Sequence, residues 1–323
     1  MKTIRQQEAI DQIPKGSVVT IGNFDGVHLG HQQIIAAGKK IASARKTQLV
    51  VMSFYPHPAV VLNPTREIGV LTPLQYKGHL LSQLGVDCLF VFDTTAELLS
   101  LSPLQFVDRF LSGCVKPVAV VEGPDFNFGA GRAGSLDRLQ QLGAEKGFEV
   151  CVVPQKQMTL AGGATVKVSS TTVRNLLQAG AVADAARALT RPYRLLGTVV
   201  PGKGKGRKIG FPTANLQPQP QIIPQDGVYA GWVLLGDSLE DLFHADRKFA
   251  AVFSIGTTPT VEPCDGRLIE AHIIGRQMAA LAGKYMAMDF VEKLRGQKKF
   301  PGEKDLARQI ESDCETATTI LKA

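Results

Sequence analysis

Apolar residues follow two different patterns along this 323-residue chain, and the change falls near residue 190. In the first part, short runs rich in Val, Ile and Phe alternate with stretches of helical spacing such as His31–Arg45. We predict buried strands at Ser17–Ile21, Leu49–Phe54, Val86–Phe92, Val118–Glu122 and Phe148–Val153. Strands that alternate with helices imply an α/β fold with a mostly parallel sheet, whose ligands bind at the carboxyl ends of the strands.

Past Arg191-Pro192, strand-like runs are separated by turns that contain Gly and Pro. We predict strands at Tyr193–Val200, Gly227–Leu235, Phe249–Ile255, Leu268–Ile274 and Tyr285–Phe290, which favours an antiparallel barrel or sandwich. Apolar residues then recur at helical spacing from Leu306 to Leu321, so we expect a C-terminal helix that packs on the barrel. The chain therefore divides into domains 1–185 and 186–323, with Ala181–Thr190 as a helical hinge.

Composition narrows the class of protein. Thirty-six basic residues against 29 acidic ones leave a formal charge of +7, which suits an anionic ligand or a nucleic acid. The five cysteines are scattered without a CxxC pair, which argues against a disulfide framework or a zinc site. Met1–Gly16 has no apolar core of a signal peptide, and no apolar run approaches the ~20 residues that span a bilayer. We expect a soluble, cytoplasmic protein.

The segment Thr20–His31 is the most informative part of the first domain, because it follows one strand and opens a helix. Its three glycines allow a sharp turn and a close approach to a ligand. The N-terminus of the following helix offers free N–H groups and a positive dipole, which favour a phosphate. His28 and His31 can both face that position and donate hydrogen bonds to a phosphorus centre that gains negative charge.

A second segment, Val168–Arg174, places Ser and Thr hydroxyls at the start of a predicted helix. Such residues favour helix caps, and by itself the segment indicates only a well-capped helix. Arg174 lies one turn further on, and its guanidinium suits bidentate phosphate binding. Together the two segments resemble the paired signatures of the nucleotidylyltransferase superfamily. In that superfamily the histidines stabilise transfer at the α-phosphate, and the Ser/Thr–Arg segment holds the distal phosphates.

The sequences of four segments more specifically resemble the adenylyltransferase half of bacterial bifunctional riboflavin kinase/FAD synthetases. These segments are Gly22–His31, Phe54–Pro58, Phe126–Gly129 and Ser169–Arg174. The resemblance implies a Rossmann-like domain in which His28 and His31 are catalytic. It assigns ATP binding to Gly22, Asn23, Phe24, Asp25, Gly26, His28, His31, Ser170, Thr171 and Arg174. It assigns FMN binding to Phe54, Pro56, His57, Pro58, Asp125, Phe126 and Phe128, although core packing is the commoner role of such aromatic residues.

The second domain opens with a glycine-rich basic loop, Gly202–Lys208. Such a loop can cover the phosphates of a nucleotide or form a nucleic-acid patch. It lacks the ending of a Walker motif, and no aromatic residues alternate with its charges, which weakens the case for single-strand binding. The block Gly210–Asn215 that follows resembles the riboflavin kinase signature and favours a nucleotide.

By this resemblance the ATP-binding residues of the kinase are Gly202, Lys203, Gly206, Arg207, Gly210, Phe211, Pro212 and Thr213. Thr213 and Asn215 would hold Mg²⁺, for which a hydroxyl and an amide oxygen are suitable hard donors. Glu270 would be the catalytic carboxylate, and Arg295 and Phe300 would contact the flavin.

The resemblance implies a bifunctional enzyme that phosphorylates riboflavin to FMN and adenylylates FMN to FAD, with ATP, riboflavin and FMN as its ligands and Mg²⁺ as cofactor. It implies neither a nucleic-acid nor a membrane partner. Two alternatives stay open at this stage: an adenylyltransferase of the same superfamily with another acceptor, and a nucleic-acid-binding protein that uses the loop Lys203–Lys208. The first would have no use for a riboflavin kinase barrel, and the second predicts a steep dependence of binding on salt.

Overall fold

The computed structural model of the chain describes residues 1–5, 10–63, 69–202, 204–257, 267–276 and 281–322. Contacts between Cα atoms divide the chain into two compact units. The first contains residues 1–159 and 163–170, and the second contains residues 160–162 and 171–323. We describe each unit by itself.

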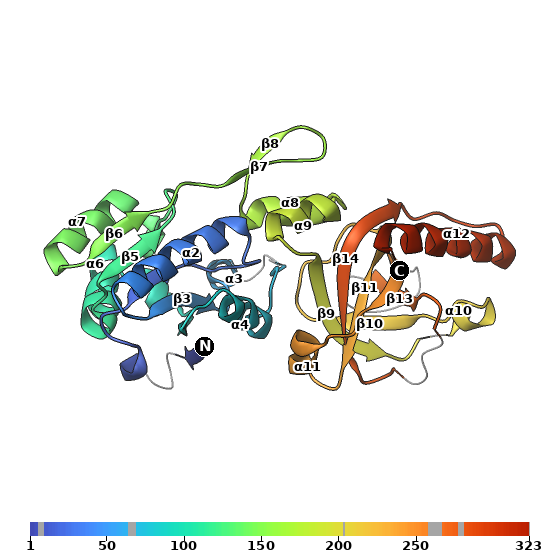
Figure 1. Cartoon of the computed structure of the whole chain (residues 1–323), viewed down its shortest axis with the longest axis horizontal. Helices are drawn as coiled ribbons and strands as arrows, with labels where there is room; N and C mark the ends of the chain where they lie inside the picture. The colour runs from blue at the N-terminus through green and yellow to red at the C-terminus, as the bar shows by residue number, and fades with distance from the viewer. Residues whose placement is uncertain (6–9, 64–68, 203, 258–266, 277–280, 323) are drawn as a thin grey trace. The chain divides into compact units, whose positions relative to one another are not determined.

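The first unit is built on a parallel sheet, as the alternating pattern predicts (Figure 1). Its strand order is β1-β4-β3-β2-β5-β6. The strands are β1 (Lys2–Arg5), β2 (Val18–Ile21), β3 (Leu49–Tyr55), β4 (Cys88–Asp93), β5 (Ala119–Glu122) and β6 (Glu149–Val152). The sequence pattern misses β1, because only Ile4 of its four residues is buried, at the sheet edge.

Helices connect these strands. They are α2 (Leu29–Ala44), α3 (Pro58–Leu62), α4 (Leu74–Gln83), α5 (Ala96–Ser100), α6 (Pro103–Phe106) with its π-helical continuation η2 (Val107–Val115), α7 (Leu136–Lys146), and the 3-10 turns η1 (Ile10–Gln12) and η3 (Ala130–Arg132). The predicted helix His31–Arg45 is present as α2, which packs on β2 and β5 through Ile35, Gly38 and Ala42. A separate hairpin pairs β7 (Gln157–Thr159) with β8 (Thr165–Lys167).

The order of this sheet reverses at β2, which lies between β3 and β5. The chain runs from β2 to β3 and β4 on one side, and then crosses to β5 and β6 on the other. Ligands of open α/β sheets bind at such a switch point, beyond the carboxyl ends of the strands. The loop that leaves β2 is the glycine- and histidine-rich segment, so the topology places it where a ligand is expected.

The second unit contains a closed antiparallel barrel, with strand order β10-β13-β12-β11-β14-β9. Its strands are β9 (Tyr193–Val200), β10 (Ala214–Pro218), β11 (Gly227–Gly236), β12 (Phe249–Thr257), β13 (Arg267–Ile273) and β14 (Tyr285–Arg295). The predicted strands are all present. The pattern misses β10, because the Gly-Phe-Pro-Thr-Ala-Asn block from Gly210 to Asn215 resembles a turn.

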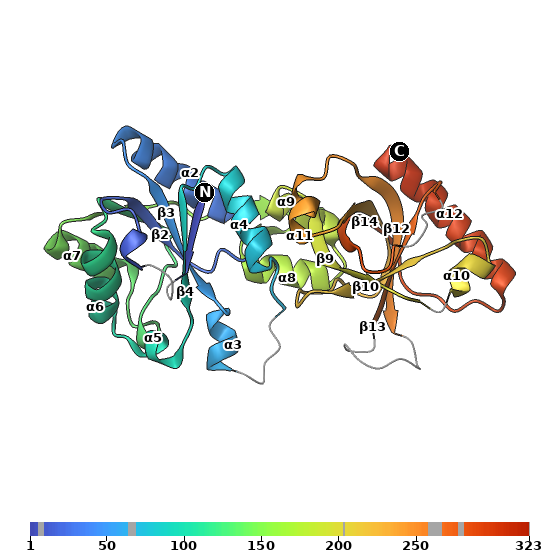
Figure 2. The same ribbon diagram turned by 90° about the horizontal axis from the view of Figure 1, so that it is seen from below.

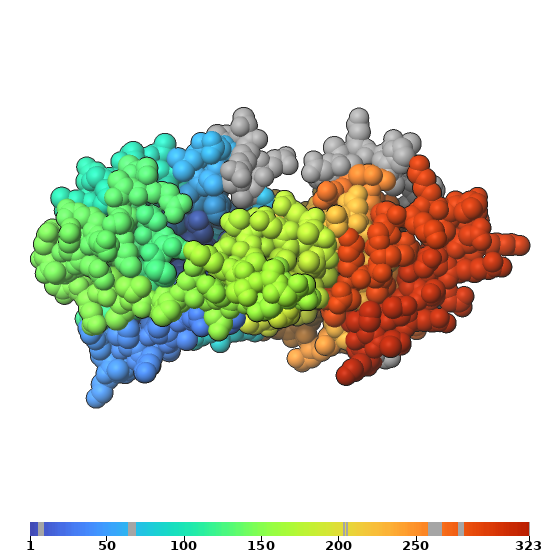
Figure 3. Space-filling view, turned by 90° about the horizontal axis from the view of Figure 1, so that it is seen from above, coloured from blue at the N-terminus to red at the C-terminus, as the bar shows by residue number. Residues whose placement is uncertain are grey.

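Besides the C-terminal helix, the described chain has α8 (Ser170–Gln178), α9 (Val182–Leu189), α10 (Lys205–Lys208) and α11 (Leu239–His244) in this part of the sequence. The hinge predicted at Ala181–Thr190 is helical, as α9, and it packs against β14 and β9. In Figure 3 the yellow-green residues that include α9 lie next to orange and red residues of the barrel unit. By contacts, α9 and the residues of α8 from Thr171 onward belong to the barrel unit.

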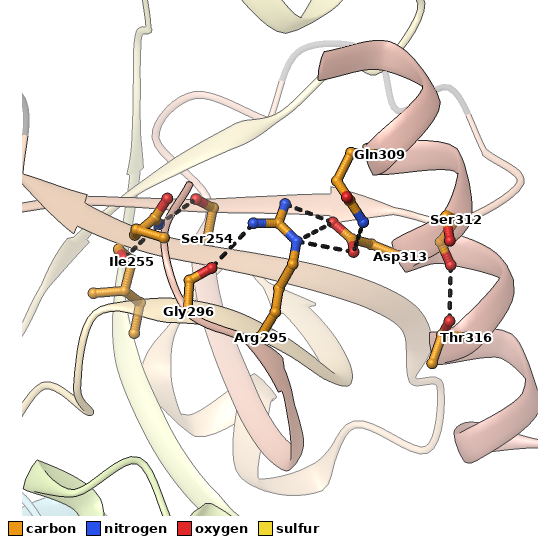
Figure 4. A network of polar contacts seen from close by, with 9 residues as sticks. Ser254, Ile255, Arg295, Gly296, Gln309, Ser312, Asp313 and Thr316 are labelled. Atoms are coloured by element: carbon orange, nitrogen blue, oxygen red, sulfur yellow. Dashed lines mark hydrogen bonds and ion pairs between the residues drawn. The ribbon is translucent and has the colours of Figure 1, made fainter. Parts of the chain in front are cut away.

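The C-terminal helix α12 (Glu303–Leu321) lies along the outside of the barrel, over β11, β12 and β14 (Figure 2). Ala317 and Leu321 pack into a cluster that includes Trp232 of β11. Arg295, at the end of β14, donates hydrogen bonds from Nε and Nη2 to the Asp313 carboxylate of α12, at 3.1 and 2.8 Å (Figure 4). Gln309 also donates to Asp313, at 3.0 Å. This network fastens the helix to the barrel.

We expect Asp313→Ala to lower the free energy of unfolding of the barrel unit by roughly 3 kcal/mol, because it leaves a largely buried guanidinium without its partner. Trp232 is the one tryptophan of the chain, so its fluorescence during urea unfolding reports on this unit. Asp305→Ala on the same helix is the control: its 4.0 Å pair with Arg308 is exposed, and we expect a change below about 0.5 kcal/mol. An equal loss of stability in the two variants would contradict the role of Asp313 in fastening α12 to the barrel.

Candidate active sites

The turn from β2 to α2 has an unusual backbone. Phe24 and Val27 have positive φ angles of 47° and 43°, in a region that non-glycine residues seldom occupy, and Gly26 has a φ of 87°. His28 caps the helix by accepting a hydrogen bond at Nδ1 from the backbone N–H of His31, at 3.4 Å. Such strain persists only where surrounding contacts fix it, and it is commonly found at functional sites.

The structure brings His28 and His31 together. Their rings stack with centroids 3.6 Å apart and an interplanar angle of 17°, and the ring of Phe24 lies 4.9 Å from His31. Gly30 leaves room for the His28 ring, because a Cβ there would lie 3.2 Å from Cε1 of His28 and the ring would have to shift by a few tenths of an ångström.

Both histidines line a cavity of about 260 Å³, together with Gly22, Gly30, Glu122, Asp125, Phe126 and Ser169. Burial, and then the neighbouring His28 and Lys77, lower the pKa of His31 well below its ordinary value. This shift in pKa favours the neutral form of the His31 imidazole. Its Nδ1 is buried and has no hydrogen-bond partner within the described part of the chain. A neutral imidazole at a helix N-terminus can donate a hydrogen bond to an anionic ligand without carrying a positive charge itself.

Asp25 and Gly26 support the turn and do not line this cavity. The buried carboxylate of Asp25 accepts hydrogen bonds from the backbone N–H groups of Leu71 (2.9 Å) and Thr72 (3.0 Å). Gly26 N–H donates to the Thr72 hydroxyl at 3.0 Å. Asp25 therefore positions the turn through these hydrogen bonds, whereas the resemblance predicts that it binds ATP.

Lys77 is a residue of this site that sequence analysis missed. It lies on α4, is only 6% exposed, and donates from Nζ to the Asn23 carbonyl oxygen (2.6 Å) and the Ser53 hydroxyl (3.2 Å). Burial lowers its pKa to about 8, against the opposing attraction of Asp25. The one signal in the sequence is a lysine at a position that the helical pattern of α4 buries with Tyr76 and Leu80.

Glu122 is a second residue that sequence analysis missed, although it ends a predicted strand. Its buried carboxyl accepts hydrogen bonds from Ile21 N–H at 2.6 Å and from the Thr20 hydroxyl at 3.4 Å. Burial raises its pKa well above the ordinary value, against these hydrogen bonds. The backbone ladder between β2 and β5 pairs only Val18 and Val19 of β2, so Glu122 joins the two strands where that ladder has ended.

A second, more apolar cavity of about 530 Å³ adjoins the first, because Ile21, Gly22, Asp125 and Phe126 line both. The residues predicted to bind FMN that line it are Phe54, His57, Pro58, Asp125, Phe126 and Phe128. Pro56, in a cis peptide bond with Tyr55, is not one of the lining residues. Phe54 and Phe126 also pack against the hydrophobic core, so the packing role considered from the sequence is present, and flavin binding stays a prediction.

Asn23 lines the larger cavity. Its amide Nδ2 lies 3.2 Å from Nε2 of His57, whose Nδ1 accepts a hydrogen bond from Ala59 N–H at 3.2 Å and so caps α3. The Asn23 Oδ1 is buried and has no partner among the residues that the structure describes. Asn23 thus presents an available acceptor next to the histidine turn.

The Ser/Thr–Arg segment begins α8, as predicted. The Ser170 hydroxyl donates to the Asp25 carbonyl oxygen at 2.8 Å, which fastens the start of this segment to the β2–α2 turn. Thr171 and Arg174 fall in the second unit, and their assignment to ATP stays a prediction.

The barrel contains a third cavity, of about 290 Å³. Of the residues predicted to bind ATP or Mg²⁺ in the kinase, those that line this cavity are Gly202, Arg207, Pro212, Thr213 and Asn215. Gly206, Gly210 and Phe211 do not line it; a Cβ at Gly206 would lie 2.3 Å from the Phe211 carbonyl oxygen, which gives this glycine a packing role. Lys203 lies outside the described residues.

Thr213 and Asn215 line this cavity, and Glu270, which does not line it, contacts Thr213. The Thr213 hydroxyl donates to Glu270 Oε1 at 3.0 Å, and Asn215 is paired with Glu270 in the register of β10 and β13. Gly202 leaves room for the Asn215 amide, because a Cβ there would lie 1.9 Å from its Nδ2. Among the described residues, no group of three His, Cys, Asp or Glu could hold a metal, so a cation here would depend on this mixed set of oxygen donors.

Arg295, predicted to contact the flavin, is bound to Asp313 of α12. Its guanidinium also lies 5.7 Å from the centroid of the Phe300 ring. These contacts give Arg295 a structural role in fixing α12 and the segment that leads to Phe300.

Family models match both units. A model described as FAD synthetase matches residues 10–172, and one described as riboflavin kinase matches residues 189–321. A curated protein of Listeria monocytogenes, named bifunctional riboflavin kinase/FMN adenylyltransferase, is 34% identical over 298 residues, covering 92% of this chain and 90% of its own length. A protein of the same name from Escherichia coli is 34% identical over 318 residues, covering 98% and 97% of the two chains.

A solved structure from Streptococcus pneumoniae matches with a TM-score of 0.84 and 27% sequence identity, and the match covers 98% of this chain and 99% of that one. Its title describes a macrolide-efflux protein. In the part of this chain that the structure describes, no helix has the length and apolar character needed to span a membrane.

The buried Lys77 predicts a pH dependence of stability. Below pH 8 the lysine is protonated in the native and unfolded states, so the native state bears the cost of burying a charge. As the pH rises from about 8 towards 10.5, the native state loses the proton first, and the free energy of unfolding rises.

We therefore expect the stability difference between wild type and Lys77→Met to change by about 2 to 3 kcal/mol in favour of wild type between pH 7 and pH 10. Unfolding is followed by circular dichroism, while Trp232 fluorescence reports separately on the barrel. A difference that does not vary with pH would contradict a lowered pKa.

Proposed function

The chain belongs to the family of bifunctional riboflavin kinase/FMN adenylyltransferases and carries both activities, and we propose how its residues divide them. Residues 1–185 transfer adenylyl groups to FMN, and residues 186–323 phosphorylate riboflavin. The boundary between these two functions differs from the boundary between the two compact units, which falls after Ser170. The reason is that most of α8 belongs to the barrel unit, whereas the first residues of α8 belong to the signature of the adenylyltransferase. The observation that carries the proposal is the pair of stacked histidines in a cavity that adjoins a second, more apolar cavity of about 530 Å³.

In adenylyl transfer, the 260 Å³ cavity receives the triphosphate of ATP and the 530 Å³ cavity receives the flavin ring of FMN. An oxygen of the FMN phosphate attacks the α-phosphorus of ATP, and the bond to the β-phosphate oxygen breaks, so that FAD forms and pyrophosphate leaves. Negative charge on the α-phosphate oxygens is stabilised by hydrogen bonds from His28 and His31 and by the N-terminus of α2. Phe54 and Phe126 supply ring-stacking surface.

In riboflavin phosphorylation, ATP occupies the 290 Å³ cavity of the barrel. Glu270 accepts the proton of the ribityl 5′-hydroxyl as its oxygen attacks the γ-phosphorus, and ADP leaves. The 3.0 Å hydrogen bond from Thr213 orients the Glu270 carboxylate.

The family uses ATP and generally a divalent metal, and we propose Mg²⁺ in the barrel site. The hydroxyl of Thr213 and the amide oxygen of Asn215 are hard donors that fit this ion, which retains water and phosphate ligands. When bound, Mg²⁺ neutralises phosphate charge. ATP, riboflavin and FMN are the proposed ligands, without nucleic acid or membrane partners, and the proposed location is the cytoplasm.

The test of both activities is incubation of the protein with riboflavin, ATP and Mg²⁺, followed by chromatographic separation of the flavins. We expect FMN to appear first and FAD to follow. Absence of FMN would overturn the kinase assignment, and FMN without FAD would overturn the adenylyltransferase assignment.

We expect His31→Ala to lower the rate of FAD formation from FMN by roughly 100- to 1,000-fold, because a hydrogen-bond donor to the transition state is lost. Phosphorylation of riboflavin by the same polypeptide should remain near wild type and is the control for folding. FMN would therefore accumulate in the combined assay. FAD formation near the wild-type rate would exclude the role of His31.

Glu270→Gln should lower FMN formation by about 100- to 10,000-fold, because the isosteric amide cannot accept the proton. FAD formation from supplied FMN should persist. Glu292→Gln, on an exposed position of β14, is the matched control and should leave both activities unchanged. If Glu270→Gln lay within a few-fold of wild type, Glu270 would not be the base.

A further inference from the structure

His272 lies two residues beyond Glu270 on the strand that carries the proposed catalytic carboxylate. Burial alternates along β13, and Glu270 and His272 are half-buried between residues that are buried. Successive side chains of a strand point to opposite faces of the sheet, so Glu270 and His272 share one face of β13. The neighbouring strand is β10, and the block that contains Thr213 leads directly into it.

His272 contacts two consecutive residues of that block. Its Nδ1 lies 2.8 Å from the carbonyl oxygen of Pro212. Its ring lies 5.4 Å from the ring of Phe211, measured between centroids, at an interplanar angle of 73°, which is an edge-to-face arrangement. A carbonyl oxygen only accepts hydrogen bonds, so Nδ1 is protonated and donates this one.

The side chain of His272 supports the backbone where strand pairing does not. The described register between β10 and β13 begins at Ala214, which pairs with Ala271. Pro212 lies before this first pair, and it has no N–H with which to extend the ladder. His272 binds the Pro212 carbonyl oxygen instead, one residue before Thr213.

The hydrogen bond from Thr213 to Glu270 benefits from this support. Thr213 is exposed, so water competes with Glu270 for its hydroxyl, and the net gain from such a hydrogen bond is small. The geometry of this contact therefore depends on how firmly the backbone of Thr213 is held. Glu270 accepts from the side chain of Thr213, and His272 holds the carbonyl group directly before it.

We propose that His272 is a positioning residue of the kinase site, which holds Thr213 where its hydroxyl orients the Glu270 carboxylate. The proposal rests on the proposed kinase function and on the roles proposed for Thr213 and Glu270. His272 acts through Thr213 and takes no proton from riboflavin. Its loss leaves the base present but poorly oriented, so the effect falls on kcat and not on KM for riboflavin.

The first test compares His272→Ala with His272→Asn in the riboflavin kinase reaction. Alanine removes the donor, whereas the Asn side chain has an amide nitrogen as many bonds from the backbone as Nδ1. We expect His272→Ala to lower kcat by roughly 10- to 100-fold, with KM for riboflavin within about twofold of wild type. His272→Asn should regain most of the lost rate.

His244→Ala, at an exposed position of α11, is the matched control and should have a kcat within about twofold of wild type. FAD formation from supplied FMN should be unchanged in every variant, and Trp232 fluorescence during urea unfolding verifies that the barrel is folded under the conditions of the assay.

A double-mutant cycle tests whether His272 acts through Thr213. Thr213→Ala removes the hydroxyl that His272 positions, so addition of His272→Ala should lower kcat by no more than about twofold further. Independent roles would instead multiply the two losses. Long-range ¹H–¹⁵N correlation spectra of the full chain give a separate readout: the His272 signals, identified by their absence in His272→Asn, should show a proton on Nδ1.

Four outcomes would overturn the proposal: a kcat of His272→Ala near wild type, an equal loss in His272→Asn, multiplied losses in the double variant, or a His272 ring protonated on Nε2 alone. Failure of the wild type to form FMN, or a kcat of Glu270→Gln near wild type, would instead overturn the proposed function or the role of Glu270 in it.

Discussion

The hydrogen bonds of three buried ionisable side chains hold the β2–α2 turn, and the geometry of the first site depends on them. Asp25 fastens the turn to Leu71 and Thr72, Lys77 reaches in from α4, and Glu122 joins β5 to the end of β2. Each group bears a desolvation cost that its hydrogen bonds offset, and for Lys77 the attraction of Asp25 also opposes this cost. With these contacts in place, Phe24 and Val27 keep left-handed backbone angles and the two histidines stack at the switch point of the sheet.

The barrel builds its site by strand pairing. Thr213 and Glu270 are 57 residues apart, yet the antiparallel register of β10 and β13 places the hydroxyl 3.0 Å from the carboxylate. The closed barrel leaves no free edge between these strands, so their register cannot slip without moving side chains to the other face. The side chains of the two sites are thus positioned in different ways. In the sheet unit they depend on a strained loop and buried ionisable groups, and in the barrel they depend on strand register.

Several residues that sequence motifs assign to ligands have supporting contacts in the structure. Asp25 receives backbone N–H groups, Gly206 makes room for the Phe211 carbonyl, and Arg295 binds Asp313 of α12. A motif records which residues recur together, and it does not separate those that touch a ligand from those that shape the loop around it. The distinction depends on burial and hydrogen-bond partners.

The sequence by itself determined the two-part architecture, most of the strands, the C-terminal helix and the two phosphate motifs, because periodicity, glycine placement and helix caps are local properties. Only the tertiary structure revealed Lys77 and Glu122, since no local signal marks a lysine or a glutamate whose hydrogen-bond partners lie far away in the sequence. It also revealed β1 and β10, whose pairing with neighbouring strands overrides weak local patterns. Charge burial and strand register depend on residues far apart in the chain, and folding alone brings them together.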